Sequence, residues 1–197
     1  GVGFGIAYSF SSFFLPLQEK FAARRGEISL VFSIAGALYF SLGLITGAIA
    51  DRFGPRLVVG GGMALVALGT FAASQADTLW QVFAGYGLGV GIGMGAAYVP
   101  AVAALQRWFN RKRGLATGIA VSGIGVGTLA GPPLAKLLID SVGWRGAWIG
   151  LALIAFAAAL FSIVTIRRSP ETYGLRPDGD AAPPAGAGPT PPASGDS

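Results

Sequence analysis

The chain has 197 residues, of which 53% are hydrophobic and only 12% are charged, and its formal net charge is +5. Because soluble domains carry roughly 25% charged residues, this composition predicts a protein that lies in a lipid bilayer. The sequence contains neither cysteine nor histidine, which excludes thiol nucleophiles, disulfides, Cys/His zinc sites and Ser–His catalysis. We therefore expect no catalytic residue, no metal site and no cofactor. The basic residues stand in short loops between apolar segments, so they predict membrane orientation and no nucleic-acid partner.

Six apolar stretches are long enough, or nearly so, to cross a bilayer, which takes about 20 residues. In chain order they cover residues 1–17, 28–50, 57–75, 80–105, 115–139 and 147–166. The first stretch opens at Gly1 inside an apolar run, so we expect it to be cut short and the chain to be a fragment. None of the six contains Asp, Glu or Arg, and Lys136 is the one charge inside them. The sequence therefore predicts an all-α membrane protein with six transmembrane helices.

The basic residues of the loops predict the orientation of these helices. One set of alternate loops, with the start of the tail, holds eight basic residues: Arg52, Arg56, Arg107, Arg111, Lys112, Arg113, Arg167 and Arg168. The other set holds five: Lys20, Arg24, Arg25, Lys136 and Arg145. Because basic residues concentrate in cytoplasmic loops, we expect both ends of this segment to be cytoplasmic in a plasma or inner cell membrane.

The composition changes at Ser169, after which Pro, Gly, Ala, Ser and Asp predominate. Such a segment cannot bury enough apolar surface to order itself. We therefore predict two parts, a transmembrane bundle over residues 1–168 and a disordered cytoplasmic linker over residues 169–197.

Two loops share the pattern D-x-x-G-x-R, at residues 51–56 and 140–145, an offset of 89 positions. Arg-Gly also precedes the second span, at residues 25–26, and the fifth, at residues 113–114, an offset of 88. The near-constant offset predicts one three-span unit used twice, and since three is odd, the two copies would have opposite orientations in the membrane. The alternative is coincidence, because Gly and Arg are common at the ends of spans.

The loop between the second and third spans carries the most specific local motif: Gly47, Asp51, Arg52, Gly54 and Arg56. A glycine at position 54 permits positive φ in a tight turn, and Asp51 can pair with the arginines and with helix ends. The alternative is a charged turn that only orients the helices. The full spacing resembles the signature loop of the major facilitator superfamily, and the resemblance extends over residues 1–168.

This resemblance implies one half of a twelve-helix carrier whose signature loop contacts the other half and helps to hold one conformational state. It implies secondary active transport of small solutes by alternating access around a site near the membrane midplane. The partners expected are a small-molecule substrate, the lipid bilayer and a C-terminal six-helix half that is missing from this sequence.

The fifth span carries a second motif, G-x8-G-x3-G-P, at Gly118, Gly127, Gly131 and Pro132. It resembles the fifth-helix motif of the family's drug and anion antiporters, except that Ala135 stands where those proteins have a further glycine. The glycines make a smooth helix face and Pro132 weakens the helix locally. Close packing without any link to antiport explains the pattern equally well.

The fourth span has a glycine at every second position from 85 to 95. A dinucleotide-binding loop is excluded because no soluble helix and no acidic residue follow it. Two G-x-x-x-G registers predict helix packing instead. Tyr98, at the end of this run, is a candidate for the substrate path, with an interfacial anchor as the alternative. Lys136 is a candidate counter-charge for substrate, although a lysine near a helix end more often extends to the interface.

Residues 107–118 read R-W-F-x-R-K-R-G-L-A-x-G, and residues 25–29 read R-G-E-I-S. Both are similar to the monocarboxylate transporter and oxalate/formate antiporter branch of the family. That resemblance implies small organic anions, such as carboxylates, as substrates. Animal monocarboxylate transporters carry a lysine in the first helix, whereas residues 8–12 contain none.

Two other classes of function compete with a carrier. Residues 121–123, Val-Ser-Gly, are faintly similar to the serine motif of rhomboid proteases, but the required histidine is absent. A structural six-span protein without a transport path is the remaining alternative. No carboxylate lies in the middle of any span, so we expect any charge that couples transport to ions to lie in the other half.

Overall fold

The computed structural model describes residues 1–109 and 111–166, and this part of the chain is helical with no strand. The elements are α1 (Val2–Ser9), the 3-10 turn η1 (Phe10–Phe13), α2 (Phe14–Phe21), α3 (Arg25–Phe53), α4 (Pro55–Ser74), α5 (Leu79–Val82), the π-helical stretch η2 (Phe83–Val90), α6 (Gly91–Trp108) and α7 (Arg113–Thr165). The predicted all-α class is confirmed. The predicted linker over residues 169–197, together with Arg167 and Arg168, lies outside the described residues.

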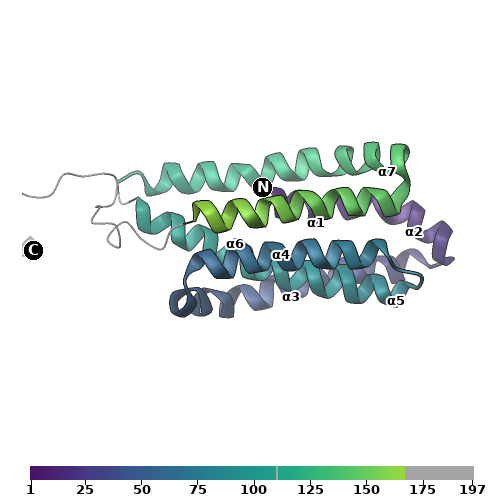
Figure 1. Ribbon diagram of the computed structural model, residues 1–197, viewed down its shortest axis with the longest axis horizontal. Coiled ribbons are helices and arrows are strands. Elements are labelled where there is room, and N and C mark those ends of the chain that lie inside the picture. The colour runs from purple at the N-terminus through teal and green to yellow at the C-terminus, as the bar shows by residue number, and fades with distance from the viewer. Residues whose placement is uncertain (110, 167–197) are drawn as a thin grey trace, which may run out of the picture.

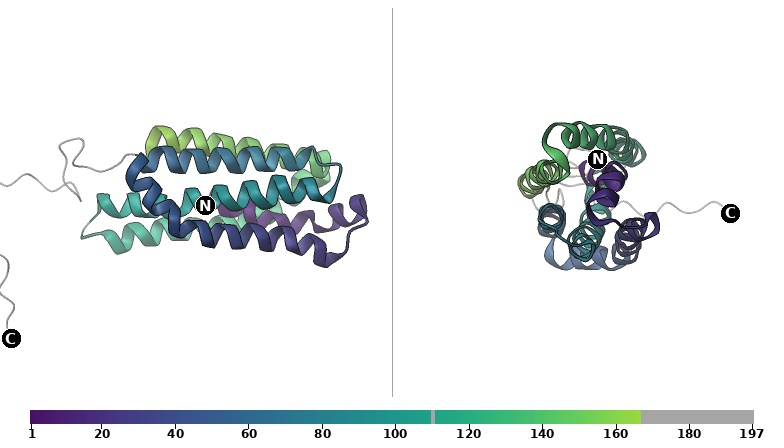
Figure 2. Two further views of the ribbon diagram at one scale, coloured as in Figure 1. Left: turned by 90° about the horizontal axis from the view of Figure 1, so that it is seen from below. Right: turned by 90° about the vertical axis from the view of Figure 1, so that its right-hand side faces the viewer.

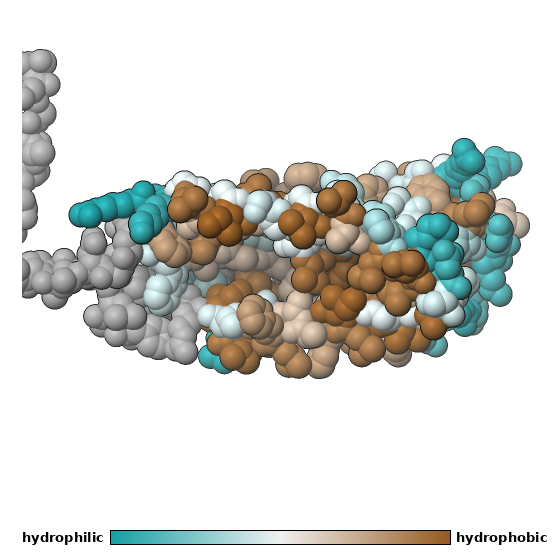
Figure 3. All heavy atoms as spheres, turned by 90° about the horizontal axis from the view of Figure 1, so that it is seen from above, coloured by the Kyte–Doolittle hydropathy of each residue, from teal (hydrophilic) through white to brown (hydrophobic). Residues whose placement is uncertain are grey.

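Within residues 1–109 and 111–166, four continuous helical segments are long and apolar enough to cross a membrane: α3, α4, Leu79–Trp108 and α7. A helix satisfies its own backbone N–H and C=O groups, which hydrocarbon cannot do. Apolar side chains cover the middle of the face in Figure 3, and hydrophilic ones gather at its two ends. The molecule therefore has the surface of a membrane protein, with four continuous spans where the sequence predicts six.

The difference in number arises at two places. In the first predicted span, η1 tightens the helix between α1 and α2, so no single helix there reaches the length of a span. The fifth and sixth predicted spans fall within α7, whose 53 residues include Gly143 in a non-helical conformation, with φ 76° and ψ 168°. The chain reverses at this point, and the two limbs of α7 run side by side (Figure 1).

Helix starts follow signals in the sequence. Glu27 accepts a hydrogen bond from the backbone N–H of Arg24 at 2.8 Å, which caps the first turn of α3. Thr78 and Gln81 make the corresponding capping box at the start of α5. Pro55 occupies the first position of α4, where its missing N–H leaves no hydrogen bond unmade. These caps fix where the chain leaves each turn and enters the bundle.

The helices lie nearly parallel and surround a common core, as the end view in Figure 2 shows. The turn at Gly54, the ends of α6 and α7, and the start of α7 gather at one end (Figure 1). The α2–α3 link, the α4–α5 link and the Gly143 turn gather at the other. Trp148, Tyr86, Phe10, Phe13 and Leu17 are among the largest fully buried side chains of the core.

The alternating glycines of the fourth predicted span face two different helices. A Cβ on Gly89 would lie 2.6 Å from the Cα of Gly69 in α4, and one on Gly91 would lie 2.8 Å from the carbonyl oxygen of Ala35 in α3. Because residues two apart point to nearly opposite sides of a helix, alternate glycines make two smooth faces. The predicted packing role of both G-x-x-x-G registers is confirmed.

α1 and the first limb of α7 meet at a second set of glycines. A Cβ on Gly127 would overlap the carbonyl oxygen of Gly1, and one on Gly131 would overlap that of Gly5. By contrast, a Cβ on Gly125 would meet open space. Only hydrogen at the α-carbon therefore allows these two helix backbones to come so close.

We predict that Gly131→Ala lowers the free energy of unfolding by about 1–3 kcal/mol, the usual penalty for overpacking a filled contact. Gly125→Ala is the matched control, because it brings the same gain in helix propensity without the clash. Denaturant unfolding in detergent micelles measures both. Equal stability of the two variants would show that the α1–α7 contact is not close-packed.

Candidate functional site

The loop between α3 and α4 turns the chain within a single residue. Gly54 has φ 90° and ψ 142°, the positive φ that glycine adopts without steric penalty. Its N–H donates to the carbonyl oxygen of Ala50 at 2.9 Å and so closes α3, and Pro55 then opens α4. The turn leaves Asp51, Arg52 and Arg56 exposed at the end of the bundle.

Asp51 pairs with an arginine from a distant part of the chain. Arg107, in the last turn of α6, donates from Nη2 to Asp51 Oδ1 at 2.5 Å. Sequence reasoning expected Asp51 to pair with the arginines of its loop and with helix ends, and it named Arg107 only as part of the 107–118 motif and of the basic loops. Arg52 lies over the ring of Phe53, 5.5 Å from its centroid. Gly47, one turn before Asp51, faces Val99 of α6, so α3 and α6 are in contact where the ion pair forms.

A second ion pair lies at the opposite end of the bundle. Arg145 donates to Asp77 Oδ1 at 2.7 Å and to the carbonyl oxygen of Ala76 at 2.9 Å. The guanidinium of Arg145 also stacks on Trp144, at 5.1 Å from the ring centroid. The first pair thus joins the last turns of α3 and α6 at one end of the bundle, and the second joins the α4–α5 link to α7 just after Gly143 at the other.

The fifth-span motif lies along the first limb of α7, and most of it contacts α1 and η1. Gly127 and Gly131 pack on the α1 backbone, and the carbonyl oxygen of Pro132 accepts a hydrogen bond from Ser12 at 3.0 Å. α7 continues through Pro132 without a break. A Cβ on Gly118 would meet open space, so the structure does not bring Gly118 to this contact.

Tyr98 and Lys136 lie far apart. Tyr98, in α6, is half-buried and packs edge-on against Phe4, with ring centroids 5.2 Å apart. Lys136, two turns before Gly143 in α7, pairs with Asp140 at 3.1 Å and keeps 71% of its side chain exposed. Such an exposed i,i+4 pair contributes only a few tenths of a kcal/mol. The two candidates therefore do not form one site.

Phe4 is the centre of an aromatic cluster that sequence reasoning missed. Its ring lies 5.6 Å from Tyr39, 5.2 Å from Tyr98 and 6.5 Å from Tyr8. A cavity of about 140 Å³ opens beside it, between α1, α3 and η2. Phe4 and Tyr8 are four residues apart, as are Gly36 and Phe40, so each pair lies on one helix face. This spacing is the sequence feature that could have indicated the cluster.

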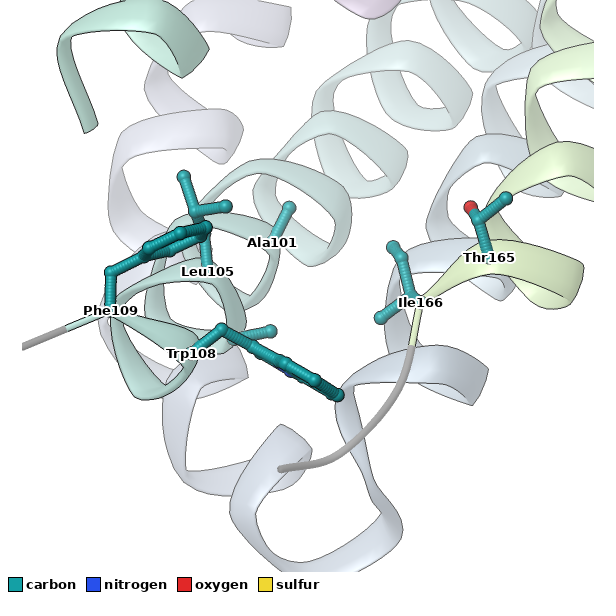
Figure 4. A pocket seen from close by; sticks show the side chains of 7 residues that line it. Ala101, Leu105, Trp108, Phe109, Thr165 and Ile166 are labelled. Carbon is teal, nitrogen blue, oxygen red and sulfur yellow. The ribbon is translucent and has the colours of Figure 1, made fainter. Parts of the chain in front are cut away.

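A larger cavity of about 400 Å³ lies where α6 and α7 end, and Figure 4 shows Trp108 and Ile166 facing each other across it. Its lining is Ala101, Ala104, Leu105, Trp108, Phe109, Thr165 and Ile166. The Thr165 hydroxyl donates to the carbonyl of Phe161, so it is already hydrogen-bonded. This lining has no charged side chain with which to recognise an ion. Among residues 1–109 and 111–166, no group of acidic side chains could hold a metal.

We predict that the Asp51–Arg107 pair contributes at most about 1 kcal/mol to folding, because the two side chains remain 65% and 40% exposed. A double-mutant cycle with Asp51→Asn and Arg107→Gln measures this coupling by unfolding in detergent. A coupling energy above about 2 kcal/mol would mean that the pair is a structural clamp, comparable to a buried charge pair.

Comparison with known proteins finds a match to the family model described as Major Facilitator Superfamily, over residues 1–193. The chain is 35% identical to monocarboxylate transporter 13 of Rattus norvegicus, over 80% of this chain and 38% of that protein. It is 33% identical to monocarboxylate transporter 11 of Homo sapiens, over 78% and 33%, respectively. It is also 33% identical to the fujikurins efflux protein of Gibberella fujikuroi, over 77% and 32%. The chain spans about a third of the length of these relatives.

Proposed function

The chain belongs to the major facilitator superfamily, and from this we propose that it forms one half of a secondary active transporter for small organic anions, such as carboxylates. The family and the relatives are those of transporters and not of enzymes. The mechanism would be alternating access, in which this bundle and a second six-helix half rock around a site between them. The protein would lie in the plasma or inner cell membrane. Both ends of the segment would be on the cytoplasmic side.

The observation that carries this proposal is the shared geometry of two turns. Gly54 and Gly143 occupy matched places in the D-x-x-G-x-R loops. Among the described glycines, these two alone have positive φ, with 90° and 76°. Both also have extended ψ, 142° and 168°. Equivalent turns at opposite ends of the bundle support two three-helix repeats of opposite orientation.

Six crossings follow if the structure is divided at these turns. α1, η1 and α2 together would make the first crossing, because a tightened turn within a span keeps its backbone hydrogen-bonded. The two limbs of α7, before and after Gly143, would make the fifth and the sixth. α3, α4 and the segment Leu79–Trp108 supply the remaining three.

The ion pair between Asp51 and Arg107 is weak enough to break and re-form during transport. An exposed ion pair is worth at most about 1 kcal/mol, so it can bias one conformation without locking it. α3 also has the lowest buried share of the four long helices, 22% of its apolar window. We propose that this open face, with Gly47 and the signature loop at its end, contacts the second half.

Tyr98 is proposed to line the substrate path, because its half-buried ring packs on Phe4, which lines the aromatic cavity. Lys136 is proposed to extend to the outer interface with Asp140, away from the path. No carboxylate lies mid-span in this chain, so the charge that couples transport would lie in the second half.

The names of two kinds of relative bear on the proposed substrate. The monocarboxylate transporters are named for monocarboxylates, and the fungal relative is named for the efflux of fujikurins. The matches therefore favour organic anions over other solutes and leave their size open. A six-span protein that transports nothing is the second candidate, and the α3 face, which the described residues leave largely exposed, is compatible with that alternative.

Uptake of radiolabelled lactate, acetate and benzoate into proteoliposomes containing the full-length gene product tests the proposal. We predict saturable uptake that is slowed about fivefold by Asp51→Asn, since 1 kcal/mol of lost bias corresponds to about that factor. Glu19→Gln, which removes an exposed carboxylate at the other end, is the matched control and should leave uptake unchanged. Absence of uptake for every anion would favour the non-transporting alternative, and equal rates for both variants would exclude the Asp51 loop from the cycle.

A further inference from the structure

The cavity beside Phe4 has the size of one six-membered ring. Its volume is about 140 Å³, and an apolar protein cavity of roughly 150 Å³ is known to hold one benzene molecule. Tyr8 and Phe40 form part of its wall and are 44% and 74% exposed, so the cavity is open at the surface of the bundle. A ligand can therefore enter without unfolding a helix.

The wall of the cavity is aromatic on several sides. Phe4, Phe32 and Phe40 line it together with Tyr8 and Tyr39, and Gly36 leaves space between them. Phe4 meets Tyr39 edge-on at 86°, and Tyr39 packs against Phe40 at 4.7 Å between centroids. Aromatic walls at such angles offer both ring faces and ring edges, which is the geometry that aromatic rings prefer in packing.

The hydroxyl groups around the cavity differ in a way that points to a ligand. The Tyr86 hydroxyl is buried and donates to the carbonyl of Ala7 at 2.7 Å, so it is satisfied. Within the part of the chain that the structure describes, the hydroxyls of Tyr8 and Tyr39, which both line the cavity, make no hydrogen bond. These phenol groups are therefore free to donate to the oxygen atoms of a bound molecule.

The lining contains no charged side chain, so it cannot itself neutralise a carboxylate. It can remove the apolar body of a molecule from water and donate neutral hydrogen bonds to its polar edge. The negative charge of the anion would then be neutralised by groups of the second half or solvated by water. An uncharged aromatic lining therefore recognises the ring of a ligand and not its charge.

We propose that the cavity between α1, α3 and η2 receives the apolar ring of a ring-bearing monocarboxylate, with the hydroxyls of Tyr8 and Tyr39 donating to its polar atoms. The proposal rests on the proposed transport of organic anions and narrows it to a substrate class. Short carboxylates without a ring would leave the cavity unfilled and would bind more weakly.

Gly36 allows the cavity to be filled without disturbing the helices. It lines the cavity, and a Cβ built on it meets nothing within 4 Å. We therefore expect the side chain of Gly36→Leu to extend into the space that a ring would occupy. Gly61→Leu is the matched control, because Gly61 is exposed on α4, has the same open surroundings and lies outside the cavity lining.

Calorimetric binding of benzoate, cyclohexanecarboxylate and acetate to the full-length carrier in nanodiscs tests the proposal without requiring transport. We expect the wild-type protein to bind the two ring acids more tightly than acetate. Gly36→Leu should weaken benzoate binding at least tenfold and leave acetate binding and the melting temperature unchanged, while Gly61→Leu should change none of these. Benzoate binding that survives Gly36→Leu, or that never exceeds acetate binding, overturns the proposal.

Two further measurements keep the test decisive. If Gly36→Leu does not fold, Gly36→Val, whose side chain is one carbon shorter, replaces it, and a selective loss of benzoate affinity supports the ring site whereas unchanged affinity overturns it. Uptake in vesicles separates the two proposals. If Gly36→Leu loses benzoate binding but the wild type takes up no anion, the ring site is supported and the transport function is rejected. Normal uptake with unaltered benzoate binding in Gly36→Leu removes the ring site alone.

Discussion

The bundle depends on the close approach of helix backbones at glycine. Lipid tails are as apolar as these side chains, so helices associate in a membrane only where they pack at short range. Gly89 meets Gly69, Gly91 meets Ala35, and Gly131 meets Gly5, each without space for a methyl group. The fourth predicted span can contact α3 and α4 simultaneously because its glycines alternate. This packing joins helices that carry almost no charge into one bundle.

The ends of the bundle have a different physical character. One-residue turns at Gly54 and Gly143 hold the chain by backbone geometry, whereas the ion pairs beside them are exposed and weak. Close-packed helices with weakly held ends fit the proposed half-carrier, which would move as a unit and exchange contacts at its ends. Under that proposal the aromatic cavity, which lies among the packed helices, would keep its shape while the access to it changes.

The sequence predicts most of the fold, because hydrophobic length and glycine spacing are local properties. The positions of α3 and α4, the tight turn at Gly54 and the packing role of the alternating glycines follow from it. The 3-10 turn η1 does not, since no Pro or Gly marks Phe10–Phe13. The partner of Asp51 and the gathering of three tyrosines around Phe4 depend on how distant helices meet, which residue patterns along one segment do not encode.

The central claim is that two three-helix units cross the membrane in opposite directions. These 197 residues contain no cysteine, so a single substitution at Lys20, Arg56, Lys112 or Ser141 provides the one thiol of this segment for labelling with a membrane-impermeant maleimide. Our account predicts that Lys20→Cys and Ser141→Cys are labelled from outside intact cells. Arg56→Cys and Lys112→Cys should be labelled only from the cytoplasmic side, in inverted vesicles. Labelling of Arg56→Cys and Lys112→Cys from opposite sides would contradict it.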